Sequence, residues 1–178
     1  MSDNIIVLKL VLLGDSAVGK TSLIDMYAHG RFKENYIPTL GVNIVAKEME
    51  LGNFQIRLII WDIAGQSKYD LSRKMFFQGV VGALFIYDIT RHGTFQNIES
   101  KWLEDLNEYG EKKLFYILIG NKTDLQDYRV VSNEEGRTLA DKINACDFVE
   151  TCAKYGENVE KAFENLVFQV LKNEGITD

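Results

Sequence analysis

Eight residues near the start of the chain have the types and spacing of a phosphate-binding loop. They read Gly14-Asp15-Ser16-Ala17-Val18-Gly19-Lys20-Thr21 and fit the pattern G-x-x-x-x-G-K-[ST]. A polyphosphate is highly negative, so such a loop must point many backbone N–H groups at it, and glycines permit the conformations and close approach this requires. Lys20 would add a charge for the outer phosphates, and the Thr21 hydroxyl can bind Mg²⁺. The alternative is an ordinary glycine-containing turn without a ligand.

A second polar motif, Asn121-Lys122-Thr123-Asp124, comes directly after the apolar run at residues 114–119. The carboxylate of Asp124 can accept two hydrogen bonds from N1–H and the 2-amino group of guanine, a donor pair that adenine lacks. A site built around such a pair strongly rejects the analogue without it. Asn121 has the donor and acceptor to tie the base to the loop, and the stem of Lys122 can lie against the ring. The motif predicts a guanine nucleotide.

A third candidate segment, Thr151-Cys152-Ala153-Lys154, follows a short predicted strand at residues 147–150. Its backbone N–H groups would face the base oxygen, and Lys154 would supply a second covering stem. The two cysteines, Cys146 and Cys152, are expected to be interior or near the site. We expect both to be free thiols in a reducing compartment.

These motifs need elements that bring them together. Strands are expected at residues 5–13, 42–50, 54–61, 83–87, 114–119 and 147–150, the second and third forming a hairpin. Helices are expected at residues 21–29, 95–109 and 157–172, and one more opens at Ser132 with a capping box to Glu135. Alternation of this kind predicts a mostly parallel sheet covered by helices on both faces. Ligands then bind at the carboxyl ends of the strands, where each motif falls.

Length, composition and charge limit the kind of protein this chain can be. The 178 residues fit one domain spanning residues 1–178, and 46% of them are hydrophobic. The formal net charge of −6 argues against a nucleic-acid partner and against general affinity for anionic membranes. No apolar run approaches the ~20 residues of a membrane span. Neither end carries a lipidation motif, so we expect a cytoplasmic protein that associates with membranes only if a lipidated tail lies beyond this chain.

The whole chain resembles a Ras-superfamily small GTPase. Four motifs match in order and spacing, at residues 14–21, 38–39, 62–66 and 121–124, and residues 150–154 resemble a fifth, E-T-S-A-K, with Cys152 replacing Ser. Residues 14–16, 40–44, 87–90 and 156–163 are most similar to the Rab family, while residues 39–42 also resemble Ran. The resemblance implies the three-layer P-loop NTPase fold, with a six-stranded mostly parallel sheet, one antiparallel edge strand and about five helices.

The resemblance also implies a role for each matching residue. Lys20 would bind the β- and γ-phosphates, Thr21 and Thr39 would bind Mg²⁺, and Asp62 would hold a metal-bound water. Catalysis would involve Gln66, which orients the attacking water, together with Lys20 and Thr39. The implied nucleotide-binding residues are Gly14, Asp15, Ser16, Ala17, Val18, Gly19, Lys20, Thr21, Ser22, Phe32, Tyr36, Thr39, Gly65, Asn121, Lys122, Asp124, Leu125, Cys152, Ala153 and Lys154.

The implied function is a switch that binds GTP or GDP with Mg²⁺ and hydrolyses GTP slowly. Loops at about residues 32–44 and 62–78 would change state and contact effectors, an exchange factor and a GTPase-activating protein. A Rab-like, monomeric protein of membrane trafficking is expected. The alternatives are a guanine-nucleotide-binding module that does not hydrolyse, a Ran-like transport GTPase, and an ATP-specific phosphotransferase, against which Asp124 argues. Ser67-Lys68-Tyr69 departs from the Rab pattern Glu-Arg-Phe and would affect regulator choice.

Overall fold

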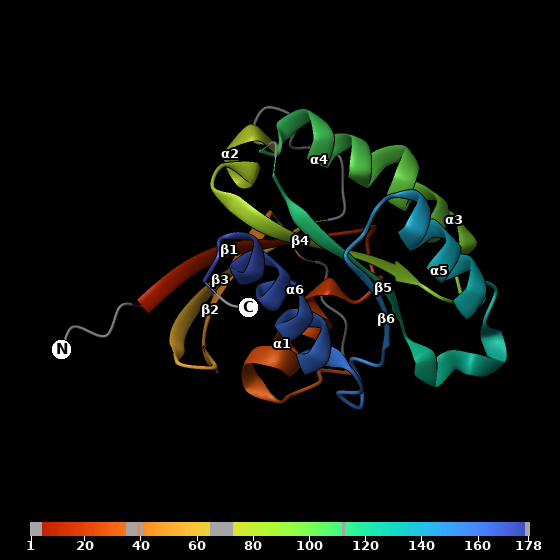
Figure 1. The fold of residues 1–178 in the computed structure, drawn as a ribbon. Coiled ribbons are helices and arrows are strands. Elements are labelled where there is room, and N and C mark those ends of the chain that lie inside the picture. The colour runs from red at the N-terminus through yellow and green to blue at the C-terminus, as the bar shows by residue number, and fades with distance from the viewer. Residues whose placement is uncertain (1–4, 35–38, 40, 65–72, 112, 177–178) are drawn as a thin grey trace.

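A six-stranded sheet organises the chain, with strand order β2-β3-β1-β4-β5-β6 (Figure 1). The computed structural model describes residues 5–34, 39, 41–64, 73–111 and 113–176. The strands are β1 (Ile5–Leu13), β2 (Val42–Leu51), β3 (Phe54–Ile63), β4 (Val80–Asp88), β5 (Phe115–Asn121) and β6 (Asp147–Thr151). Only the edge strand β2 pairs antiparallel, with β3, and the other pairings are parallel. The predicted sheet, with its one antiparallel edge strand, is confirmed.

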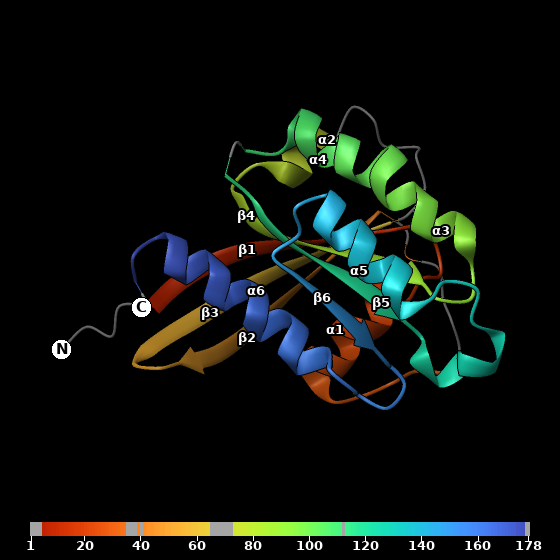
Figure 2. The same ribbon diagram turned by 45° about the vertical axis from the view of Figure 1, so that its right-hand side comes forward.

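Helices cover both faces of the sheet, as predicted. They are α1 (Lys20–His29), α2 (Arg73–Phe77), α3 (His92–Asn97), a π-helical turn η2 (Ile98–Leu103), α4 (Glu104–Tyr109), a 3₁₀ helix η3 (Thr123–Tyr128), α5 (Asn133–Lys142) and α6 (Val159–Asn173). Figure 2 shows α1 and α6 together on one side of the sheet, with α2, α3, α4 and α5 on the other. The chain therefore has three layers. None of these described helices is long and apolar enough to cross a membrane.

Side-chain alternation along the central strands supplies a separate core to each face. Leu10 and Leu12 of β1 pack with α1 and α6, in a cluster that includes Phe163. Val11 and Leu13 of the same strand pack with the helices of the other face. The period of two in a strand separates these two sets of residues, so one buried strand contributes to both cores.

The helix predicted at residues 95–109 differs in form from the prediction. It begins at His92, and the segment Ile98–Leu103 is a π-helical turn between α3 and α4. Apolar spacing marks the buried face of such a segment but does not report a local change of helical type. The capping box at Ser132 is confirmed, because the Glu135 backbone N–H donates to Ser132 Oγ at 3.2 Å and the Ser132 N–H donates to Glu135 Oε2 at 2.7 Å.

The carboxyl ends of the parallel strands meet at one edge of the sheet. The phosphate-loop segment follows β1, Asp62 lies near the end of β3, and Asp88 ends β4. Asn121 ends β5 and Thr151 ends β6. Residues far apart in sequence are thus brought to one place, as the fold class predicts.

Candidate functional site

The loop between β1 and α1 depends on its glycines for packing against the protein behind it. Gly14 has φ of 156° and Gly19 has φ of 106°. A Cβ atom at Gly14 would lie 2.2 Å from Ile86 O, and one at Gly19 would lie 2.3 Å from Asn121 Nδ2. Larger residues at either position would therefore push the loop away from β4 and β5.

Lys20 is buried, with 6% of its surface exposed, and its ammonium binds the loop itself. Nζ donates to Gly14 O at 2.8 Å and to Asp15 O at 3.0 Å. Burial lowers the pKa of Lys20 to about 8, although the charges of Asp62 and Asp15 act in the opposite direction. A cation desolvated in this way is held at the centre of the loop, where anionic phosphates would offset its cost.

Asn121 joins the phosphate loop to the segment after β6. Its Nδ2 donates to Val18 O at 2.9 Å, while its Oδ1 accepts from Thr151 Oγ1 at 2.9 Å and from the Ala153 N–H at 3.3 Å. Both ends of this buried amide are therefore used within the protein. The next residue, Lys122, donates from Nζ to Ala17 O at 2.8 Å.

The predicted base-reading residues surround a pocket of about 520 Å³. Its lining residues are Ala17, Gly19, Ser22, Phe32, Lys33, Glu34, Asn121, Lys122, Asp124, Leu125, Ala153 and Lys154. Cys152 is buried beside the pocket, and its thiol donates to Asp124 Oδ1 at 3.3 Å. Cys146 is exposed, so the expectation of an interior position was wrong for this cysteine. Both thiols are free, as predicted.

Three predicted Mg²⁺-site residues converge beside Lys20. Thr21 Oγ1 donates to Asp62 Oδ2 at 2.5 Å and lies 2.8 Å from Thr39 Oγ1. Asp62 is fully buried, and its Oδ1 has no hydrogen-bond partner within the described part of the chain. Burial raises the pKa of Asp62, while the Thr21 hydrogen bond and the Lys20 charge lower it. Hydroxyl and carboxylate oxygens fit Mg²⁺, which commonly binds one or two carboxylates together with phosphates.

Several predicted positions lie outside the described residues. They are Tyr36, Gly65 and Gln66, together with the departing segment at residues 67–69. The proposed orientation of the attacking water by Gln66 is therefore a prediction. Among the described residues, no group of three or more acidic, histidine or cysteine side chains could hold a metal by itself.

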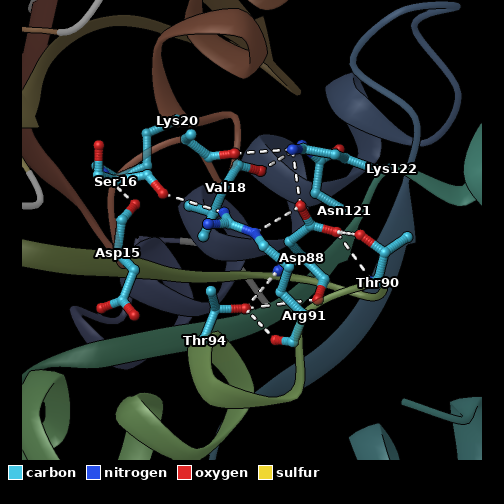
Figure 3. Close-up of polar contacts among 11 residues, drawn as sticks. Asp15, Ser16, Val18, Lys20, Asp88, Thr90, Arg91, Thr94, Asn121 and Lys122 are labelled. Atoms are coloured by element: carbon cyan, nitrogen blue, oxygen red, sulfur yellow. Dashed lines mark hydrogen bonds and ion pairs between the residues drawn. The ribbon is translucent and has the colours of Figure 1, made fainter. Parts of the chain in front are cut away.

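Three residues outside the recognised motifs also contact the loop. Trp102 Nε1 and Asn97 Nδ2 donate to the Asp15 carboxylate at 2.9 and 2.7 Å. Arg91 Nη2 donates to Ser16 O at 3.0 Å, and Arg91 Nε donates to Asp88 Oδ2 at 3.0 Å (Figure 3). Trp102 is buried, at 4% exposure, and apolar spacing gives no sign of its polar bond. The π-helical turn, with its i→i+5 geometry, is the element that carries Trp102.

Comparison with known proteins decides the family. The Ras family profile matches residues 9–172. The chain belongs to the Ras family. It is 40% identical to Ras-related protein RABA5c of Arabidopsis thaliana over 165 residues, covering 93% of this chain and 76% of that protein. It is 41% identical to RABA6b of the same plant over 162 residues, covering 91% and 70%.

A third relative, Ras-related protein Rab11B of Nicotiana tabacum, is 38% identical over 164 residues, covering 92% of this chain and 75% of that protein. The chain is therefore a Rab-like small GTPase that binds GTP and GDP with Mg²⁺ and hydrolyses GTP. Like other members of its family, it acts with effectors, exchange factors and GTPase-activating proteins. This membership favours hydrolysis over the two non-GTPase alternatives.

Proposed function

We propose that the pocket beside residues 14–22 is the GTP site and that residues 1–178 form one switch domain of a Rab-like trafficking GTPase. One observation carries the proposal. The loop residues Ala17 and Gly19 line one pocket together with Asp124, and the hydrogen-bonded pair Thr21–Asp62 lies next to it, because Thr21 precedes the lining residue Ser22. Base, phosphates and metal each have residues of suitable chemistry there.

Catalysis in this site would depend on position and charge. Lys20 and the loop N–H groups would stabilise negative charge on the phosphates, while Gln66 orients the attacking water. Thr21 and Thr39 would hold Mg²⁺ directly and Asp62 through a water, and the ion would supply neutralising charge. Asp124 would select guanine, with Phe32, Lys122 and Lys154 covering the base.

The switch loops at residues 32–44 and 62–78 would carry the regulatory contacts. Ile44 on β2 is 51% exposed and Met75 on α2 is 69% exposed, so each segment contributes apolar surface. Trp61 lies opposite Ile44 in the β2–β3 register and is 6.2 Å from the Phe76 ring. Such a surface suits effector proteins better than nucleic acid, given the net charge of −6. A monomeric, cytoplasmic protein, with membrane attachment only through a further lipidated tail, stays our prediction.

The nucleotide carried by the purified protein tests this proposal. Denaturation should release GDP or GTP, and the native protein with Mg²⁺ should prefer guanine to adenine nucleotides. Gln66→Leu should leave nucleotide affinity unchanged and slow single-turnover phosphate release at least about tenfold, since it removes the group that orients water.

Gln55→Leu is the matched control, because Gln55 lies on the hairpin and its side chain donates to Glu50 Oε1 at 2.7 Å. Its phosphate release should equal that of the native protein. Equal phosphate-release rates for Gln66→Leu and the native protein would show that Gln66 has no catalytic role. Absence of guanine preference would overturn the site assignment.

A further inference from the structure

Three consecutive carbonyl groups of the phosphate loop accept hydrogen bonds from side chains at the ends of two strands (Figure 3). One donor comes shortly after β4, and the other two are the last residue of β5 and the residue after it. These bonds run from Arg91 Nη2 to Ser16 O at 3.0 Å, from Lys122 Nζ to Ala17 O at 2.8 Å, and from Asn121 Nδ2 to Val18 O at 2.9 Å. In a planar trans peptide the carbonyl and N–H point to opposite sides. A donor that fixes the carbonyl of one unit therefore also fixes the direction of its N–H.

Ala17 occupies the most demanding position of this loop. Its φ is 60°, the left-handed region that a residue with a Cβ atom rarely adopts. The carbonyls of Ser16 and Ala17 belong to the peptide units on its two sides. Arg91 donates to the Ser16 carbonyl and Lys122 donates to the Ala17 carbonyl, so the peptide units on both sides of the strained residue are fixed by hydrogen bonds.

The carboxylate of Asp88 forms ion pairs with both Arg91 and Lys122. Its Oδ2 lies 2.7 Å from Lys122 Nζ and 3.0 Å from Arg91 Nε, and its Oδ1 accepts from the N–H and hydroxyl of Thr90. Burial by itself raises the pKa of Asp88, but the hydrogen bonds from Lys122 and Thr90 outweigh it and hold the pKa below its usual value. The carboxylate is thus ionised at neutral pH.

The backbone of Arg91 is also fixed. Its N–H donates to Asp88 O at 3.0 Å, and its carbonyl accepts from the Thr94 N–H at 3.0 Å and from Thr94 Oγ1 at 2.8 Å. Arg91 immediately precedes α3, with φ of −133°. Its guanidinium is consequently directed at the loop by an anchored backbone and a buried carboxylate.

We propose that Arg91, held by Asp88, is a positioning residue for nucleotide binding: it keeps the Ser16–Ala17 peptide unit oriented so that the Ala17 N–H faces the phosphates. Arg91 lies outside every motif that identified the site. The proposal rests on the phosphate-binding role proposed above for residues 14–22. It assigns Arg91 no contact with the nucleotide, because its bonds are to Ser16 O and Asp88.

Release of a fluorescent GDP analogue tests the proposal. Arg91→Ala should speed dissociation roughly tenfold, as the loss of one charge-assisted hydrogen bond of ordinary strength would. The preference for GDP over IDP should stay unchanged, because IDP lacks only the 2-amino group that faces Asp124. A variant that merely destabilised the whole site would change both the GDP release rate and the preference for GDP over IDP.

Arg57→Ala is the matched control. Arg57 and Arg91 have similar side-chain exposure, 44% and 42%, and each forms an ion pair, that of Arg57 with Glu48 at 2.6 Å. Arg57 lies on β3 opposite Val7, near the amino end of β1 rather than beside the loop that follows it. Its removal should leave GDP release unchanged, and equal rates for the two variants would overturn the proposal.

Ala17→Gly tests whether Arg91 acts through the strained residue. Glycine adopts a positive φ without the cost of a Cβ atom, so removing Arg91 should have a smaller effect in this background. The expected result is a clear non-additivity in release rates. A tenfold effect of Arg91→Ala that is equally large in the Ala17→Gly background would show that Arg91 does not act through Ala17, which contradicts the proposal.

Arg91→Lys provides a milder variant should the alanine protein not fold. Lysine keeps the charge but cannot bridge Asp88 and Ser16 O with two separate nitrogens, so release should still be faster than in the native protein. Native release would contradict the bridging role. Failure of the native protein to bind guanine nucleotides would instead overturn the proposed site itself, whatever the behaviour of the variants.

Discussion

At the scale of single residues, Cys152 is the most informative departure from the family pattern. It replaces the Ser of E-T-S-A-K, yet its thiol still donates to Asp124 Oδ1 at 3.3 Å, the carboxylate that we propose recognises the base. Burial raises the pKa of the Cys152 thiol, so it stays protonated and able to donate. A thiol is a weaker donor than a hydroxyl. The carboxylate is therefore held more loosely than a serine would hold it.

Cys152→Ser should slow GDP release by roughly two- to fivefold and raise the preference for GDP over IDP, because the stronger hydroxyl bond fixes Asp124 better. Cys152→Ala should do the opposite. Fluorescent GDP release, with IDP as competitor, measures both effects.

Cys146→Ser is the matched control, because Cys146 is the exposed thiol, and it should behave as the native protein does. Identical release from the serine and alanine variants at position 152 would show that this hydrogen bond does not influence base recognition.

At the scale of elements, β4 and α5 pack closely at the ring of Tyr87. Tyr87 of β4 is fully buried, and its hydroxyl has no hydrogen-bond partner within the described ranges. Burial raises the pKa of Tyr87 well above its usual value. A Cβ atom at Gly136 of α5 would lie 2.6 Å from that hydroxyl and 2.3 Å from the Phe148 ring. The glycine therefore permits the close approach of α5 to the sheet.

Tyr87→Phe should leave the free energy of unfolding unchanged or raise it by about 1 kcal/mol, because it removes an unsatisfied buried hydroxyl without leaving a cavity. Gly136→Ala should lower it by about 1–3 kcal/mol through overpacking. Chemical denaturation of the GDP-loaded proteins measures both values. A loss above about 1 kcal/mol in Tyr87→Phe would mean that the hydroxyl has a stabilising partner after all.

At the scale of the whole molecule, the carboxyl ends of the parallel strands gather charged residues around the phosphate loop. Lys20, Lys122 and Arg91 place positive charge around the loop, and buried Asp62 and Asp88 compensate part of it. A bound polyphosphate would interact with charge that comes from β4, β5 and α1. Ligand binding should accordingly stabilise the entire domain and not only the loop.

Removal of Mg²⁺ and nucleotide should lower the thermal midpoint by roughly 10 °C. Ligand at 1,000 times its Kd contributes about 4.1 kcal/mol, and each kcal/mol shifts a domain of this size by roughly 2–4 °C. Calorimetry on loaded and stripped protein measures this shift. GDP with Mg²⁺ should restore the midpoint and ADP should not. Equal restoration by ADP would contradict recognition of the base by Asp124.

The sequence by itself determined the sheet and the order of its motifs, and it predicted the residues that bind the nucleotide. Buried strands, helix caps and phosphate loops depend on residue types at short spacing, so residues 14–21, Ser132 with Glu135, and 121–124 could be interpreted locally. The hairpin predicted at residues 42–50 and 54–61 differs from β2 and β3 by no more than two residues at the ends.

Only the tertiary structure decided how the loop is held. Arg91 meets Ser16 across 75 residues and Trp102 meets Asp15 across 87, and neither contact has a local pattern. Periodicity shows that a residue such as Trp102 is buried, but not which polar atom its indole N–H will reach. That partner is Asp15, which reaches Trp102 only when the π-helical turn is packed beside the phosphate loop.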